Sequence, residues 1–149
     1  MIAIRSTSSA DLRILLPQVR SLMNRNRGLG YIPVSARGNN GFTKIIQRGN
    51  CIVALCDDHL LGYVAWGRMV PLNVHRVYQI VVRPEIRRMG LGTALLARMI
   101  ATVRSDVVAY VREDLQECGF WERHGFEELL WYNHPTSGNV IRIYHRPWS

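Results

Sequence analysis

The spacing of apolar residues predicts how the chain divides into strands and helices. Residues 2–5 alternate as a short strand does. A helix follows, because its apolar residues fall on one face of a 3.6-residue period: Leu12, Leu15, Leu16, Val19, Leu22 and Met23. Residues 25–50 are rich in Arg, Gly and Asn and predict mostly loop, including 38–41, with a short helix over 42–47. We interpret this segment as a lid over a substrate site.

The rest of the chain alternates between strands and helices. Strands are predicted over 51–56, 60–69 and 74–83, the first two joined by a polar turn. A helix over 93–104, a strand over 107–111, a helix over 114–124 and strands over 126–132 and 139–146 complete the pattern. This order predicts an α/β fold with a mixed sheet of about six or seven strands and about four helices. The chain has no internal repeat or linker, so we expect one domain over 1–149.

Composition restricts the class of protein. Of 149 residues, 48% are hydrophobic and 20% are charged, which excludes a disordered or collagen-like chain. The uncharged apolar stretches are far shorter than the roughly 18 residues that a membrane span needs, and the first residues lack the apolar core of a signal peptide. We therefore expect a cytoplasmic protein with no membrane partner. The three cysteines and five histidines show no metal-ligand spacing, so no metal is expected.

Positive charge is concentrated in the first third of the chain. The net charge is +8, and residues 1–50 hold eight basic side chains against one acid. All but one of the basic residues are arginine, whose planar guanidinium binds phosphate through two parallel hydrogen bonds. A polyanionic partner such as tRNA or DNA is one interpretation of this charge, and a solvated basic surface is the other.

The clearest chemical signal lies between the strand 74–83 and the next helix. It reads Arg87-Arg88-Met89-Gly90-Leu91-Gly92-Thr93, a glycine-containing loop that opens a helix. Backbone N–H groups at such a junction point toward one spot, where the helix dipole also favours an anion. Gly90 and Gly92 let a ligand approach the main chain, and Arg87 and Arg88 add charge. The sequence therefore predicts a phosphate site, but the P-loop lysine and the third glycine of the dinucleotide fingerprint are both missing.

The R-x-x-G-x-G pattern from Arg87 to Gly92 resembles the signature of the GNAT superfamily of N-acetyltransferases. The segment from Asp114 to Phe126 is similar to the late N-x-x-A-x-x-x-Y-x-x-x-G-F pattern of that family, and the element order agrees over nearly the whole chain. The resemblance implies a GNAT fold in which the strand 74–83 splays from the strand 107–111. Acyl-CoA, in general acetyl-CoA, would lie in that gap, contacting the main chain of Ile80, Val81, Val82, Arg88, Met89, Gly90, Leu91, Gly92 and Thr93.

The resemblance also implies direct attack of an amine on the thioester, and the residues for proton transfer stay open. The tyrosine that often protonates the leaving thiolate corresponds to Trp121, which has no suitable proton and is assigned to packing against the cofactor. The candidates are Tyr78 and Asp114. Strand alternation predicts that Arg76, Tyr78 and Ile80 share one face. The alternatives are a wall residue for Tyr78 and a helix cap for Asp114.

On the acceptor side, the resemblance places Arg25, Arg27 and Tyr31 of the predicted lid, together with Arg76. The leading hypothesis is an acyl-CoA-dependent N-acyltransferase, monomeric or homodimeric, that acetylates a small amine, a protein N-terminus or a group linked to nucleic acid. The alternative is a GNAT-like module that binds nucleic acid or senses CoA without catalysis. Trp121 favours the module, whereas the intact Arg87 to Thr93 loop favours the enzyme.

Overall fold

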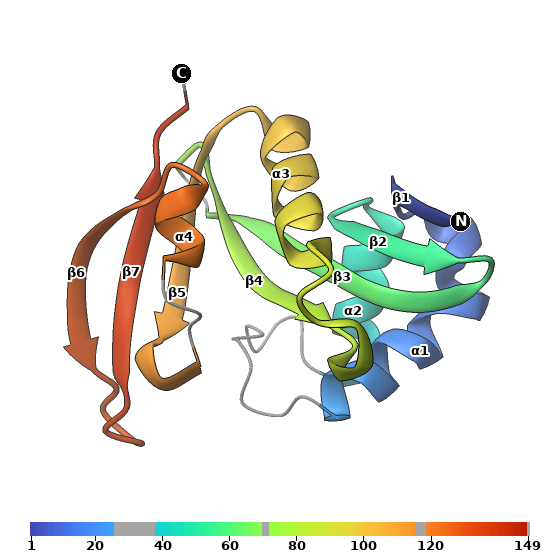
Figure 1. Cartoon of the computed structure of the whole chain (residues 1–149), viewed down its shortest axis with the longest axis horizontal. Coiled ribbons are helices and arrows are strands. Elements are labelled where there is room, and N and C mark those ends of the chain that lie inside the picture. Colours follow the sequence, from blue (N-terminus) through green and yellow to red (C-terminus); the bar gives the residue numbers. More distant parts are fainter. Residues whose placement is uncertain (26–37, 70–71, 116–118, 149) are drawn as a thin grey trace.

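A computed structural model describes residues 1–25, 38–69, 72–115 and 119–148, which form a seven-stranded mixed sheet with helices on both faces (Figure 1). The strand order is β1-β2-β3-β4-β5-β7-β6. The strands are β1 (Ile2–Ser6), β2 (Cys51–Cys56), β3 (His59–Met69), β4 (Val74–Val82), β5 (Asp106–Arg112), β6 (Glu127–Asn133) and β7 (Val140–Arg146). The helices are α1 (Leu12–Arg25), α2 (Gly38–Gln47), α3 (Leu91–Val103) and α4 (Phe120–Arg123). Only β4 and β5 pair in parallel among the described strands.

Two apolar cores lie on opposite faces of the sheet. The first is formed where α1 and α2 cover one face, and it includes Leu15, Val19, Leu22, Phe42 and Ile46. The second is formed where α3 and α4 cover the other face, and it includes Leu95, Leu96, Met99, Trp121 and Phe126. Because both faces are covered, β2, which lies between β1 and β3, is apolar and buried along almost its whole length.

The predicted order of elements is confirmed, with two local corrections. Residues 38–41, predicted as loop, are the first turn of α2. The helix predicted over 114–124 is instead a 3-10 turn at Glu113–Leu115 and the short helix α4, with 116–118 outside the described residues. Gly119 accounts for the late start of α4, because its φ of +76° lies in the left-handed region and cannot continue a helix.

Within the described residues, each helix is too short or too polar to cross a membrane. The same residues contain no cluster of three His, Cys, Asp or Glu side chains that is able to hold a metal ion.

Candidate active site

The sheet opens between its two parallel strands. β4 and β5 pair from Val74 with Asp106 to Val77 with Ala109, yet β4 continues to Val82 and β5 to Arg112. Beyond the last pair the two strands run apart (Figure 1). The main chain of the second half of β4 therefore faces the opening, where an extended ligand can complete its hydrogen bonds. The predicted splay is confirmed.

A cleft of about 790 Å³ occupies this opening, within the range of roughly 300–1,000 Å³ that ligand sites span. The predicted cofactor residues that line it are Ile80, Val81, Val82, Arg87, Arg88, Gly90, Leu91, Gly92, Thr93 and Trp121. Met89 does not line the cleft, and the residue is 65% exposed. The same cleft is also lined by five residues that were not predicted from the sequence: Gln79, Tyr110, Arg112, Phe120 and Arg123.

The loop between β4 and α3 has backbone geometry suited to an anion. Arg88 and Gly90 both have left-handed φ angles, +74° and +78°, and alternating backbone of this kind forms anion-binding concavities. α3 starts at Leu91, two residues earlier than predicted. Its first hydrogen bond runs from the Ala94 amide to the Gly90 carbonyl at 3.0 Å, so the amides of the first turn need partners outside the helix.

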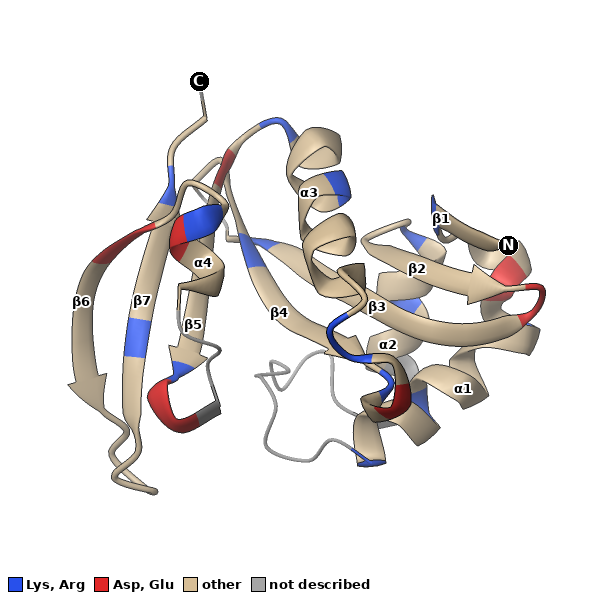
Figure 2. Ribbon diagram, viewed as in Figure 1, with Lys and Arg blue, Asp and Glu red and all other residues tan. Residues whose placement is uncertain are grey.

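Space and charge at this loop also suit an anion. A Cβ built on Gly90 meets no atom within 4 Å, so a ligand can reach the main chain there. Figure 2 shows basic positions along the loop that leads into α3. Arg87 and Arg88 supply this charge, and Arg123 of α4 lines the same cleft.

A β-bulge in β4 changes the expected alternation of its side chains. Ala65 pairs with Gln79, whereas the next residue of β3, Trp66, pairs with Val77. Tyr78 is therefore the extra residue on β4. Bulges re-aim side chains and are common beside active sites, and this one lies where β4 leaves β5.

The bulge corrects the prediction that Arg76, Tyr78 and Ile80 share one face. Tyr78 packs against the core of α1 and α2, whereas Ile80 packs against the core of α3 and α4. Gln79 bonds to Tyr63 of the first core and so lies on the same side as Tyr78. Two neighbouring polar side chains consequently face the α1–α2 side of the opening.

Tyr78 is positioned by the absence of a side chain on β3. A Cβ on Gly67 would lie 1.8 Å from Tyr78 Oη and 2.4 Å from Cζ, so only glycine leaves room for the ring. Tyr78 lines the cleft. A phenol carries a hydroxyl proton that it can donate, so this side chain suits a proton donor better than a base.

Gln79 is a buried polar group at the same place. Its side chain is 7% exposed, and its Oε1 accepts a hydrogen bond of 2.7 Å from Tyr63 Oη. Burial raises the pKa of Tyr63, so this hydroxyl stays protonated and donates. An amide inside an apolar strand is the sequence signal by which Gln79 could have been found, because a buried polar group needs a partner.

Asp114 binds Arg112 rather than lining the cleft. The Arg112 Nε donates to Oδ1 at 3.1 Å, and Nη2 donates to Oδ2 at 2.7 Å. The hydrogen bond from Arg112 lowers the pKa of Asp114, which weakens it as a base. Its observed contact orients Arg112, which does line the cleft. A catalytic role for Asp114 stays a prediction.

Trp121 forms part of both the second core and the cleft wall. It is 7% exposed, its ring meets the edge of Phe126 at 5.1 Å, and it stacks with Tyr144 at 6.2 Å. Its neighbour Phe120 would lie 3.7 Å from a Cβ on Gly92. α4 thus packs beside the start of α3 and closes that side of the cleft.

Of the four predicted acceptor-side residues, the structure describes Arg25 and Arg76. Arg25 ends α1 and forms an ion pair with Glu85 in the 3-10 turn after β4. Arg76 lies on β4, with its guanidinium 3.8 Å from the centre of the Tyr110 ring. Arg27 and Tyr31, with the rest of the 26–37 part of the predicted lid, lie outside the described residues.

Comparison with protein families identifies this arrangement. Residues 25–126 match the profile of the Acetyltransferase (GNAT) family. The chain belongs to this family. The match spans the opening, the anion loop and α4, and it confirms the resemblance drawn from Arg87 to Gly92. The GNAT protein is thus an N-acetyltransferase whose co-substrate is acetyl-CoA. No curated protein sequence matches the chain.

Solved structures with this fold act on different acceptors. The ribosomal-protein-S18-alanine N-acetyltransferase of Escherichia coli matches with a TM-score of 0.75 and 22% identity, over 100% of this chain and 95% of that one. The diaminobutyrate acetyltransferase of Paenibacillus lautus, in complex with L-2,4-diaminobutyric acid and coenzyme A, matches with a TM-score of 0.74 and 15% identity, over 100% and 96%.

A third structure is longer than this chain. The N-acetylglutamate synthase of Neisseria gonorrhoeae, with coenzyme A and N-acetyl-glutamate, matches with a TM-score of 0.72 and 18% identity, over 100% of this chain and 35% of that one. This chain therefore spans about a third of the synthase. At such identities the likeness shows the fold alone.

Proposed function

We propose that this GNAT enzyme transfers the acetyl group of acetyl-CoA directly to an amine, in the opening between β4 and β5. The observation that carries the proposal is the end of β4–β5 pairing at Val77 and Ala109, beside a loop built to bind an anion. An elongated ligand with amide groups and a phosphorylated end matches both features.

The residues around the cleft fit acyl-CoA. The main chain of Ile80 to Val82 faces the opening and suits the amides of pantetheine. The amides from Arg88 to Thr93 suit its pyrophosphate, and the guanidinium of Arg123 adds charge to the same cleft. When bound, acetyl-CoA supplies an activated thioester carbonyl.

The chain's own contribution to the reaction is mainly positioning. The bulge places Tyr78 and Gln79 on the α1–α2 side of the sheet, and Tyr78 Oη, which lies beside Gly67 of β3, carries a proton on this face. The described residues that line the cleft include no carboxylate or imidazole. We therefore assign removal of the amine proton to water rather than to a protein base.

The basic first third of the chain supports an acceptor that is linked to a polyanion such as tRNA or DNA. Part of this charge is balanced within the chain, because Arg5 pairs with Asp11 and Arg25 pairs with Glu85. A nucleic-acid acceptor stays a prediction, which release of the CoA thiol from acetyl-CoA in the presence of a tRNA or a DNA oligonucleotide tests.

Calorimetry with CoA tests the proposed site. The wild type is expected to bind CoA, and Gly90→Pro is expected to abolish binding, because proline removes an amide and cannot adopt the φ of +78°. Gly138→Pro is the matched control: Gly138 has a φ of +73° and equally open surroundings, but it lies in the turn between β6 and β7, away from the cleft.

The control variant is expected to keep the CoA affinity of the wild type. Absence of CoA binding by the wild type contradicts the proposal, as does equal affinity of Gly90→Pro and the wild type.

A further inference from the structure

A second cavity, of about 260 Å³, adjoins the cleft. Tyr110 and Arg112 of β5 line both cavities. Ala109 packs in the core of α3 and α4, so strand alternation places Tyr110 on the opposite face of the sheet. The second cavity therefore lies beside the last β4–β5 pair, on the face toward which Tyr78 points.

Two arginines line this second cavity, Arg76 of β4 and Arg112 of β5. The guanidinium carbon of Arg76 lies over the Tyr110 ring, 3.8 Å from its centre. The ion pair with Asp114 holds Arg112 in place. Among the described residues that line the cavity there is no aspartate or glutamate.

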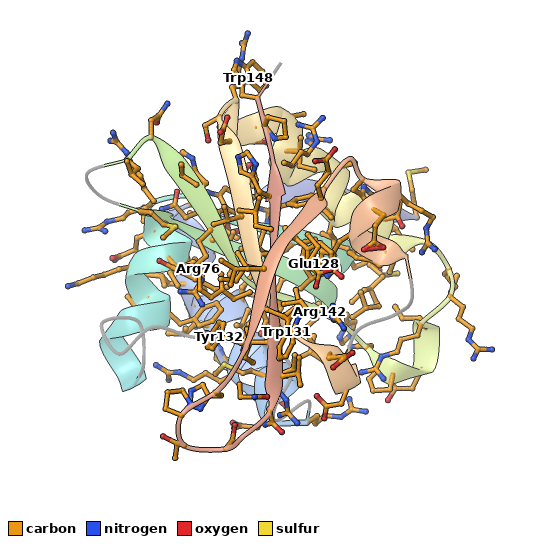
Figure 3. The ribbon with its side chains drawn as sticks, turned by 90° about the vertical axis from the view of Figure 1, so that its left-hand side faces the viewer. Arg76, Glu128, Trp131, Tyr132, Arg142 and Trp148 are labelled. Carbon is orange, nitrogen blue, oxygen red and sulfur yellow. The ribbon has the colours of Figure 1, made fainter. Side chains whose placement is uncertain are left out.

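The β6–β7 hairpin supplies neutral polar groups to the cavity, from Tyr132, His134, Ser137 and Asn139. The His134 Nδ1 accepts hydrogen bonds from the amides of Thr136 and Ser137 at 3.2 and 3.3 Å, so the proton of the neutral ring is on Nε2. Figure 3 shows Arg76 and Tyr132 on the α2 side of the hairpin, and Glu128 and Arg142 on the α4 side. Glu128, which pairs with Arg142, is thus turned away from the cavity.

We infer that this cavity holds the anionic group of the acceptor, and that the acceptor is a small amine that also carries a carboxylate or a phosphate. The inference rests on the proposed acetyl transfer to an amine in the adjoining cleft. Guanidinium groups bind both anions through paired hydrogen bonds. A volume of about 260 Å³ is below the range of about 300–1,000 Å³ for drug-sized ligands, so the cavity suits a molecule of the size of an amino acid.

A panel of matched amines tests the inference by release of the CoA thiol from acetyl-CoA. L-2,4-Diaminobutyrate is paired with 1,3-diaminopropane, and O-phosphoethanolamine with ethanolamine, so that each pair differs by the anionic group. We expect kcat/KM to be about 10-fold or more higher for the anionic member of at least one pair, the size of effect of a hydrogen bond to a charged group. The pair that shows the preference identifies the anion as carboxylate or phosphate.

Variants then assign the preference to the second cavity. Arg76→Gln is expected to bring the ratio of kcat/KM between the anionic and the neutral amine of the preferred pair toward one. The change is expected mainly in a higher KM for the anionic amine. Arg98→Gln removes the same charge from the exposed face of α3, and it is expected to keep the ratio of the wild type.

Three outcomes would overturn the inference while the CoA site stands. The first is an equal kcat/KM for the two amines of each pair. The second is acetylation of a tRNA or a DNA oligonucleotide but of no small amine. The third is that neither anionic amine, at millimolar concentration, shows calorimetric binding to protein saturated with CoA. Loss of CoA binding itself would instead contradict the proposed function.

Discussion

Gly67 and Tyr78 show how a single missing side chain on one strand determines the position of a candidate catalytic group on the next. The bulge makes Tyr78 the extra residue of β4, and the space for its ring is that of the absent Cβ of Gly67. A contact of 1.8 Å to Oη and 2.4 Å to Cζ is far inside van der Waals distance, so neither Tyr nor Phe fits at position 78 beside an alanine.

At this residue scale, Gly67→Ala is expected to lower the free energy of unfolding by about 1–3 kcal/mol, the usual cost of overpacking. It is also expected to lower kcat, because Tyr78 must move. Urea unfolding and thiol release measure the two effects.

A double-mutant cycle supplies the control for this prediction. Gly67→Ala is expected to cost less stability in a Tyr78→Ala background, where the clashing ring is gone. Identical costs in the two backgrounds would show that the two side chains do not compete for this space.

At the scale of elements, α1 starts from a local charge network that joins it to β1. Asp11 accepts a hydrogen bond from the Ser8 amide at 2.8 Å and two from Arg5 at 2.9 Å each. The hydrogen bond from Arg5 lowers the pKa of Asp11. Ser8 and Asp11 thus define where the helical segment begins, and Arg5 holds that start against the edge of the sheet.

Asp11→Ala is expected to cost about 0.5–2 kcal/mol of stability at pH 7, as loss of a helix-capping interaction does. Because the pKa of Asp11 is lower in the folded than in the unfolded protein, its contribution is present above about pH 4 and is lost as the pH falls through the folded pKa. The difference between wild type and variant in urea unfolding should therefore shrink from pH 7 to pH 3. Glu127→Ala, an exposed control on β6 far from Arg5, should change stability by less than about 0.5 kcal/mol at both pH values.

At the scale of the whole molecule, the β4–β5 opening divides the sheet into two parts. α1 and α2 pack on β1 to β4, and α3 makes most of its contacts with the same strands. α4 packs on the part formed by β5, β7 and β6. The strands of the two parts pair over only four residues, so a ligand in the cleft contacts both parts at once.

This arrangement predicts where CoA protects the main chain. Hydrogen exchange is expected to slow on CoA addition in peptides that cover 78–82 and 88–94, because the ligand pairs with amides there. Peptides that cover β2, buried between β1 and β3, should exchange at unchanged rates. Protection spread evenly over the chain, or absent from both segments, contradicts ligand binding in the opening.

The cofactor side of the site was largely predictable from the sequence. A strand that ends in Val81-Val82, followed by arginines and two glycines at a helix start, determines a local backbone with exposed amides and positive charge. Such a conformation depends mainly on neighbouring residues, and so its pattern is visible without the rest of the molecule.

The acceptor side was decided by tertiary structure. The bulge at Tyr78 depends on how β4 pairs with Ala65 and Trp66 of β3, and it moved Ile80 to the face opposite Tyr78. The second cavity depends on four strands and a hairpin turn, whose residues are spread from position 76 to position 141. The break at Gly119 ended a periodic helix that the apolar pattern alone had predicted. Local residue types determine the conformation of a segment, whereas strand register and packing determine which distant side chains meet, and only the folded chain defines those.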